Sequence, residues 1–312
     1  MSGRVLITGG AGFIGSNYIK LAAETHVDWT IRVVDALTYS GNRDNLAGLE
    51  DRIEFVHGDI ADVAVVDEVM QGCDGVINFA AETHVDRSLI DSRPFIHSNV
   101  LGTQVLLDGC RRHGVSRFVQ VSTDEVYGDL SGTSRRSIES DVLQPRSPYA
   151  ASKAAAECLV QAAQASFGLD TVITRGSNTY GPYQYPEKIV PLFITNALND
   201  VPLPVYGKGN AVRDYMHVAD HCSGIDLVLQ CGVTGGIYNL GTGLETNGCE
   251  VAKRVLDALD KPESLISFVQ DRLGHDYRYA IDASAARSLG WSPKWTFEKG
   301  LQETIEWYTQ NQ

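Results

Sequence analysis

Short apolar segments rich in β-branched residues alternate with longer amphipathic segments over the first 180 residues of the chain. Apolar runs of four to eight residues are typical of buried strands, whereas apolar residues spaced three and four apart are typical of helices. The pattern predicts strands at 4–8, 31–35, 53–57, 76–80, 117–122 and 171–175, and helices at 14–25, 63–71, 98–113 and 149–167. This alternation indicates an α/β fold with a Rossmann-type, doubly wound parallel sheet.

The pattern changes near residue 177, where proline and glycine become frequent, as in GPYQYPEK at 181–188. We expect a smaller C-terminal α/β lobe there, partly interleaved with the first, because the run at 237–240 can add a final strand to the sheet. The expected division assigns residues 1–176, with about 215–241, to the sheet domain. It assigns residues 177–214 and 242–312 to the smaller lobe.

Composition narrows the class of protein further. The chain has 312 residues, of which 43% are hydrophobic and 21% charged, as in ordinary globular proteins. Its net charge of −13 argues against nucleic acid or an anionic membrane surface as partner. No apolar run reaches the ~18 residues that span a bilayer, and no secretory signal opens the chain. Six scattered cysteines without a CxxC motif predict a reduced, cytoplasmic protein with no disulfide framework and no metal site.

A glycine-rich turn, GGAGFIG at residues 9–15, directly follows the first predicted strand and opens a helix. Such turns let the backbone approach a pyrophosphate held at the helix N-terminus. Asp35 ends the second strand, where a carboxylate can accept both hydroxyls of an adenosine ribose. No arginine follows Asp35 to receive a 2′-phosphate, so the sequence favours NAD over NADP. A plain glycine turn followed by a strand-end aspartate is the alternative.

Tyr149 and Lys153 lie in SPYAASK, where Ser147 and Pro148 suit the start of a helix. A spacing of four places the phenol and the ammonium on one helical face. The ammonium favours the phenolate, so we expect Tyr149 to act as a base near neutral pH. An exposed helical pair is the alternative, although the dinucleotide-binding start of the chain makes it weaker.

Two adjacent carboxylates follow a buried strand in FVQVSTDEVYG, residues 118–128. Placing Asp124 beside Glu125 is costly, because like charges repel and burial penalises both. Neighbouring carboxyls with different pKa values can act as one acid and one base. A helix N-cap at Thr123 followed by first-turn acids is the structural alternative.

Long motifs make the chain resemble the dTDP-glucose 4,6-dehydratases of the extended short-chain dehydrogenase/reductase family, over nearly its whole length. The motifs are GGAGFIGSNY at 9–18, VVDALTYSGN at 33–42, FAAETHVDRS at 79–88, VSTDEVYG at 121–128, SPYAASK at 147–153, SNTYGPYQYPEK at 177–188, VYGKGNAVRDYMHVAD at 205–220 and DRLGHDYRYAID at 271–282. The last three are the most specific.

The resemblance implies a lyase reaction in three steps. Tyr149 takes the C4 hydroxyl proton of dTDP-glucose while NAD oxidises C4, and Thr123 shares that oxygen. Glu125 then removes the C5 proton, which the 4-ketone makes acidic, and Asp124 protonates the departing C6 hydroxyl. The reduced cofactor finally returns its hydride to C6, and a proton returns to C5. Because there is no net redox change, we expect the protein to carry NAD when purified.

The resemblance also implies binding residues on both sides of the site. The NAD site is expected to contain Gly9, Gly12, Phe13, Ile14, Gly15, Asp35, Leu37, Thr38, Asp59, Ile60, Ala80, Ala81, Ser98, Ser122, Tyr149, Lys153 and Thr179. The sugar-nucleotide site is expected to contain Thr83, His84, Thr123, Asn178, Glu187, Lys188, Pro204, Tyr206, Arg213, Asn247, Arg272 and His275. Arg213 and Arg272 suit the diphosphate and nucleoside end, because arginine binds phosphate in a bidentate manner.

Some features depart from the family pattern or leave alternatives open. Thr83 stands where many relatives have serine, and the looser glycine pattern around Asn247 makes that residue less secure. A UDP-glucose or GDP-mannose 4,6-dehydratase would use similar chemistry. A 4-epimerase or a decarboxylase would not need the pair at 124–125. A catalytically silent dinucleotide-binding scaffold would be expected to lack Tyr149, Lys153 or Glu125. The family also implies a homodimer, which pairs the helices near 98–113 and 149–167 into a four-helix bundle.

Overall fold

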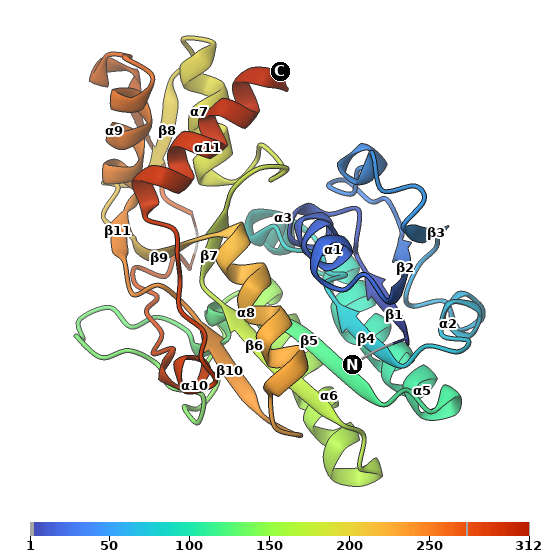
Figure 1. The fold of residues 1–312 in the computed structure, drawn as a ribbon. Helices are drawn as coiled ribbons and strands as arrows, with labels where there is room; N and C mark the ends of the chain where they lie inside the picture. Colours follow the sequence, from blue (N-terminus) through green and yellow to red (C-terminus); the bar gives the residue numbers. More distant parts are fainter. Residues whose placement is uncertain (1–2, 273, 312) are drawn as a thin grey trace.

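The computed structural model describes residues 3–272 and 274–311 of the chain, and a seven-stranded sheet is its main element (Figure 1). The strand order is β10-β6-β5-β4-β1-β2-β3, and every neighbouring pair is parallel. The strands are β1 (Gly3–Thr8), β2 (Trp29–Asp35), β3 (Ile53–His57), β4 (Gly75–Asn78), β5 (Arg117–Thr123), β6 (Thr171–Gly176) and β10 (Ile237–Leu240). The predicted Rossmann-type parallel sheet is therefore confirmed, including the final strand at 237–240.

Helices cover both faces of this sheet (Figure 1). One face carries α1 (Phe13–Thr25) and α8 (Val218–Cys231), and the other carries α2 (Val63–Val69), α5 (Thr103–His113) and α6 (Pro148–Phe167). The alternation of side chains along a strand explains this arrangement. In β1, Val5 and Ile7 join the core beneath α1 and α8, whereas Leu6 packs in the core beneath α2, α5 and α6.

The helix predicted at 98–113 is the second part of a longer helical segment. It is preceded by α3 (Val85–Ile90) and α4 (Arg93–Phe95), and a π-helical stretch, Ile96–Gly102, leads into α5. Asn99 in this stretch binds both backbone groups of Glu82, accepting from its N–H at 2.9 Å and donating to its carbonyl at 3.0 Å. The π-helical stretch Ile96–Gly102 therefore also holds the segment that follows β4, through the two hydrogen bonds between Asn99 and Glu82.

A smaller set of elements follows β6. β7 (Asn178–Tyr180), β9 (Val212–His217) and β11 (Glu245–Asn247) form a three-stranded sheet, and β8 (Leu203–Tyr206) pairs with β12 (Ile266–Val269). The helices here are α7 (Ile189–Leu198), α9 (Gly248–Ala258) and α11 (Phe297–Gln310), whereas α10 (Ser284–Ser288) packs beside β10 of the large sheet. Short 3-10 turns follow β2 at Arg43–Leu46, β5 at Asp124–Tyr127 and α9 at Glu263–Leu265. A separate apolar core joins α7, α9 and α11. Because α8 and β10 return to the large sheet after β9, the two sets of elements are interleaved.

Among the described residues, none of the helices has the length and apolar character required to cross a membrane.

Candidate active site

A cavity of about 540 Å³ opens at the carboxyl ends of the parallel strands, where the smaller lobe faces the sheet. Its wall is built from the ends of β1, β2, β4, β5 and β6 on one side, and from β7, α7 and the segments near 204–213 and 272–275 on the other. Crevices at this edge of doubly wound sheets are where ligands bind. All of the predicted site residues line it except Leu37 and Asn247.

The glycine turn is shaped by close backbone contacts that no other residue permits. Gly9 has a φ of +65°, and a Cβ there would lie 2.6 Å from the backbone nitrogen of Ala80. A Cβ on Gly15 would lie 2.4 Å from the carbonyl oxygen of Gly9. Gly12 is the N-cap of α1 and supplies no side chain to that helix end. The turn therefore leaves the positive end of α1 open to an anion, as a pyrophosphate site requires.

Asp35 stands at the end of β2 with its carboxylate held from two sides. It accepts hydrogen bonds from the N–H of Ala11 at 2.9 Å and of Leu37 at 2.8 Å. Burial raises the pKa of Asp35, although these two bonds oppose the rise. Leu37 itself has a φ of +49° and takes part through its backbone only, while Thr38 lines the cavity.

The remaining predicted NAD residues lie along the same wall. Ala80 and Ala81 follow β4 directly beside the glycine turn. Asp59 accepts from the N–H of Ala61 at 2.8 Å and pairs with His97, also at 2.8 Å. Ile60 and Ser98 also line this part of the cavity, which leads away from the end of β5.

The end of β5 carries the polar residues that the sequence singled out. The Thr123 hydroxyl accepts from the N–H of Glu125 at 3.2 Å, so it caps the 3-10 turn Asp124–Tyr127. The N-cap at Thr123, which was the structural alternative for this stretch, is therefore also present. Thr123 caps the turn and lines the cavity at the same time. Thr123 donates weakly to Asp124 Oδ1, at 3.3 Å.

Asp124 and Glu125 occupy different electrostatic environments. Asp124 is 2% exposed, and its Oδ2 has no hydrogen-bond partner among the described residues. Burial and the neighbouring Glu125 raise the pKa of Asp124 well above its usual value. Burial also raises the pKa of Glu125, but the cations Arg272, Arg213 and Lys188 oppose that rise. The pair is therefore arranged for Asp124 to hold a proton and for Glu125 to ionise more readily.

Tyr149 and Lys153 project from the first turns of α6, whose start is fixed by Ser147 and Pro148. The Ser147 hydroxyl accepts from the N–H of Ala150 at 3.1 Å. Lys153 donates to the carbonyl of Val121 at 2.6 Å, and burial lowers the pKa of this lysine to about 8. Burial and the nearby Glu125 raise the pKa of Tyr149, whereas a bond to Thr123 lowers it. The expected shift toward phenolate is not seen, because burial dominates and raises the pKa of Tyr149, while Lys153 is bonded to the backbone of β5.

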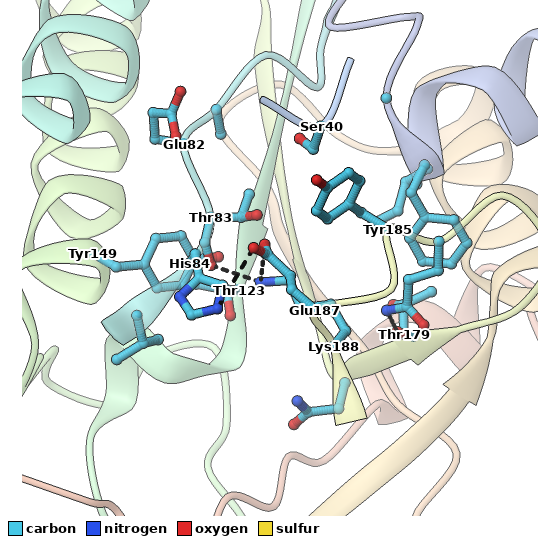
Figure 2. Close-up of a pocket in the computed structure, with 18 of the residues that line it drawn as sticks. Ser40, Glu82, Thr83, His84, Thr123, Tyr149, Thr179, Tyr185, Glu187 and Lys188 are labelled. Carbon is cyan, nitrogen blue, oxygen red and sulfur yellow. Dashed lines mark hydrogen bonds and ion pairs between the residues drawn. The ribbon is translucent and has the colours of Figure 1, made fainter. Parts of the chain in front are cut away.

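A second group of polar residues, His84, Glu187 and Lys188, lies across the cavity from Tyr149 (Figure 2). Lys188 donates to the carbonyl of Thr83 at 3.0 Å and lies 3.9 Å from Glu187. Glu187 also approaches His84, at 3.6 Å. Figure 2 shows His84, Glu187 and Lys188 pointing into the space that Tyr149 and Thr123 border.

The end of the cavity away from the glycine turn holds the two predicted arginines and other residues predicted for the sugar-nucleotide site. Arg213 is buried, donating to the carbonyls of Val212 and Asp276 at 2.8 Å each. The other predicted residues here are Pro204, Tyr206, Arg272 and His275, and all of them line the cavity. Asn178 lines it near the end of β6. Asn247 instead caps α9, because its Oδ1 accepts from the N–H of Glu250 at 2.9 Å.

Several residues that line the cavity were not predicted. They include Ser40, Glu82, Asp86, Gln184, Tyr185, Ile189 and His221. Tyr185 and Gln184 lie in GPYQYPEK, so their place in a resembling motif could have found them. His221 carried no signal, since it follows the last residue of the quoted motif that ends at 220.

Comparison with known proteins places this geometry in a family. Residues 6–304 match the family model described as GDP-mannose 4,6 dehydratase. The chain belongs to this family. A curated relative, the low-salt glycan biosynthesis protein Agl12 of Haloferax volcanii, is 47% identical over 97% of this chain and 98% of its own length. A dTDP-glucose 4,6-dehydratase of Streptomyces niveus is 45% identical over 99% of this chain and 93% of its own.

Solved structures agree with this assignment. A crystal structure of a dTDP-glucose 4,6-dehydratase from Streptomyces venezuelae, solved with NAD bound, matches with a TM-score of 0.95 at 46% identity. The match covers 99% of this chain and 97% of that chain. The resemblance to the dTDP-glucose 4,6-dehydratases, drawn from the motifs, is confirmed.

Proposed function

We propose that this protein is a dTDP-glucose 4,6-dehydratase that uses NAD as a bound cofactor. It converts dTDP-glucose to dTDP-4-keto-6-deoxyglucose and water, so it is a hydro-lyase. The observation that carries the proposal is the buried Asp124 beside Glu125, on the same cavity wall as Tyr149 and Lys153. The match to dTDP-glucose 4,6-dehydratases, which covers 99% of the chain at 45% to 46% sequence identity, supports the same reaction and substrate.

The residues at the glycine turn fit NAD. The turn leaves no room for any Cβ at Gly9 or Gly15, and the N-terminus of α1 is free of a side-chain cap. We assign the pyrophosphate to this turn and the adenosine ribose to Asp35. When bound, NAD supplies the oxidation of the sugar at C4 and its later reduction at C6.

Proton transfer at C4 falls to Tyr149, with Thr123 sharing the same sugar oxygen. The phenol is buried and protonated in this structure, since its pKa is raised. Two groups of the chain can favour loss of the phenolic proton. One is the Thr123 hydroxyl, and the other is the charged form of Lys153, whose pKa of about 8 leaves it largely cationic at neutral pH.

Elimination of water falls to the carboxyl pair. Glu125 removes the C5 proton, since three surrounding cations favour its ionised form. Burial and the neighbouring Glu125 raise the pKa of Asp124 and so favour its protonated form, which donates its proton to the departing C6 hydroxyl. The difference in environment between two adjacent carboxyls therefore assigns the acid and the base.

The diphosphate of the substrate needs local cations on a chain of net charge −13. We assign it to Arg213 and Arg272, with Lys188 nearer the sugar. Lys188 is partly exposed, and desolvation lowers its pKa, whereas Arg213 is buried. An anion bound between them would replace the water that the fold has removed from these cations.

Incubation with dTDP-glucose and, separately, with UDP-glucose tests this proposal, with the product followed by mass spectrometry. We expect loss of one water from dTDP-glucose, and no loss with a Glu125→Gln variant. Water loss from UDP-glucose alone would keep the mechanism and overturn the substrate. An unchanged mass with inverted stereochemistry would make the protein a 4-epimerase, and the pair at 124–125 would need another role.

We further propose that residues 1–176, with about 215–241, form the NAD-binding domain, and that 177–214 with 242–312 form the sugar-nucleotide lobe. The separate apolar core of the smaller set of elements supports this division. We propose a homodimer that pairs the helices near 98–113 and 149–167. Exposed Ile96, Leu101 and Phe167 on these helices support it, and light scattering of the purified protein tests it. Six unpaired cysteines are compatible with a cytoplasmic location.

A further inference from the structure

His221 is a buried histidine on the cavity wall to which the mechanism above gives no role. It is the fourth residue of α8 and is 2% exposed. Its Nδ1 lies 2.8 Å from the hydroxyl of Thr179. Its Nε2 has no hydrogen-bond partner among the described residues. Buried polar atoms in folded proteins are nearly always paired, so an orphaned nitrogen on a cavity wall points to a ligand.

We assign the tautomer of His221 from the hydrogen bonds around Thr179. The Thr179 hydroxyl donates its one proton to the carbonyl of Ser177, at 3.1 Å. With that donation the hydroxyl accepts from His221, and we accordingly assign the ring proton to Nδ1. Burial lowers the pKa of His221 to about 4, so the ring is neutral at working pH. Nε2 is consequently a buried acceptor without a partner among the described residues, on a side chain that lines the cavity.

The fold places this acceptor at the end of β6, across the sheet from Lys153. Arg175 points toward α6 and pairs with Glu157, so the next residue, Gly176, faces α8. A Cβ at Gly176 would lie 2.5 Å from His221 Nε2, so only glycine lets the ring reach this strand end. Gly176 is paired with Thr123 in the adjacent strand. The side chains of Ser177 and Asn178 beside it also have an oxygen without a partner among the described residues.

We propose that His221 is a cofactor-binding residue, whose Nε2 accepts a hydrogen bond from the carboxamide N–H of the nicotinamide. The nicotinamide must reach Thr123 and Tyr149 for oxidation at C4, and the end of β6 is the neighbouring wall. The carboxamide is the N–H donor of that ring. His221 thus fixes the ring from the sheet face opposite Lys153, and Thr179 orients His221.

The proposal rests on NAD as the cofactor and is tested by cofactor binding rather than turnover. The probes are NAD and its 3-acetylpyridine analogue, in which a methyl ketone replaces the carboxamide and no N–H remains. Wild-type apoprotein should bind NAD roughly five- to tenfold more tightly than the analogue, the usual range for one hydrogen bond. Equal affinities of the wild type for the two probes would overturn the proposal without any variant.

Two substitutions separate the two nitrogens of the ring. In His221→Asn the amide can replace Nδ1 and keep the bond to Thr179, but nothing replaces Nε2. The preference for NAD over the analogue should then fall to about one. In His221→Gln the amide can replace Nε2, and a preference of several-fold should return. If His221→Asn keeps the wild-type preference, Nε2 serves a water or the fold alone, and the proposal fails.

His217→Asn is the matched control, because His217 is also buried at the start of α8 but does not line the cavity. This variant should lower the melting temperature and leave the preference for NAD unchanged. Failure of the proposed function would look different. A protein that is not an NAD enzyme would bind neither probe, whereas failure of the His221 assignment alone would leave both bound with equal affinity.

Discussion

Asp124→Asn separates the role of this carboxyl in catalysis from its effect on stability. Asp124 is buried, lacks a partner for Oδ2 among the described residues, and has a pKa raised well above its usual value. Asparagine has nearly the same shape and cannot ionise or donate a proton as an acid. We therefore expect the variant to lose activity while its stability at neutral pH rises.

The magnitude of each effect follows from the position of the proton. The folded state binds the Asp124 proton more tightly than the unfolded state does, so stability falls as pH rises above the unfolded pKa of about 3.9. Each unit of raised pKa costs about 1.4 kcal/mol once the pH exceeds the folded value. Melting temperature changes by roughly 2–4 °C per kcal/mol in domains of this size class. Losing a general acid lowers the rate of a proton-transfer step by roughly 10²- to 10⁴-fold.

The assay compares melting temperatures of wild type and variant between pH 4 and pH 8, alongside the rate of water loss. The gain in melting temperature for Asp124→Asn should be larger at pH 8 than at pH 4. Asp214→Asn is the control, since Asp214 is equally buried but accepts from Thr242 and from the N–H of Gly243. That variant should be destabilised. A lower melting temperature for Asp124→Asn at pH 8, or a rate of water loss within tenfold of wild type, would refute the role of Asp124 as a protonated general acid.

Three further changes probe other parts of the account. Gly15→Ala should yield protein without bound NAD on purification, because its Cβ would lie 2.4 Å from the Gly9 carbonyl. The nucleotide released on denaturation measures the NAD content, and a full complement of NAD would contradict the role given to the glycine turn. Glu157→Gln should lower the free energy of unfolding by roughly 3–5 kcal/mol in urea titrations, since it leaves the buried Arg175 without its 2.6 Å partner. Asn247→Ala should cost about 1 kcal/mol through loss of the α9 cap, with an unchanged KM for dTDP-glucose; a raised KM would return Asn247 to the substrate site.

The periodic patterns were sufficient to predict the large sheet, because its strands are buried on both faces and read as short apolar runs. The glycine turn, Asp35 and the Tyr149–Lys153 pair were predictable for a similar reason. Each is a short local motif, and residues of each line the cavity. Leu37, which follows Asp35, takes part only through its backbone N–H.

Features that depend on tertiary neighbours were not predictable. The different pKa values of Asp124 and Glu125 arise from cations on β9 and near residue 272, which only the fold brings together. The engagement of Lys153 by the Val121 carbonyl, and the raised pKa of Tyr149, depend on burial beside β5. His221 was missed because its role comes from contact with Gly176 and Thr179, both more than 40 residues away in sequence.

The central claim is that one bound cofactor oxidises C4 and reduces C6 of the same sugar. The most direct test uses dTDP-glucose with deuterium at C4, in ordinary water, with the product analysed by NMR and mass spectrometry. The account predicts loss of one water, deuterium at C6 and a solvent proton at C5. Deuterium that stays at C4, or that is lost to solvent, would contradict it.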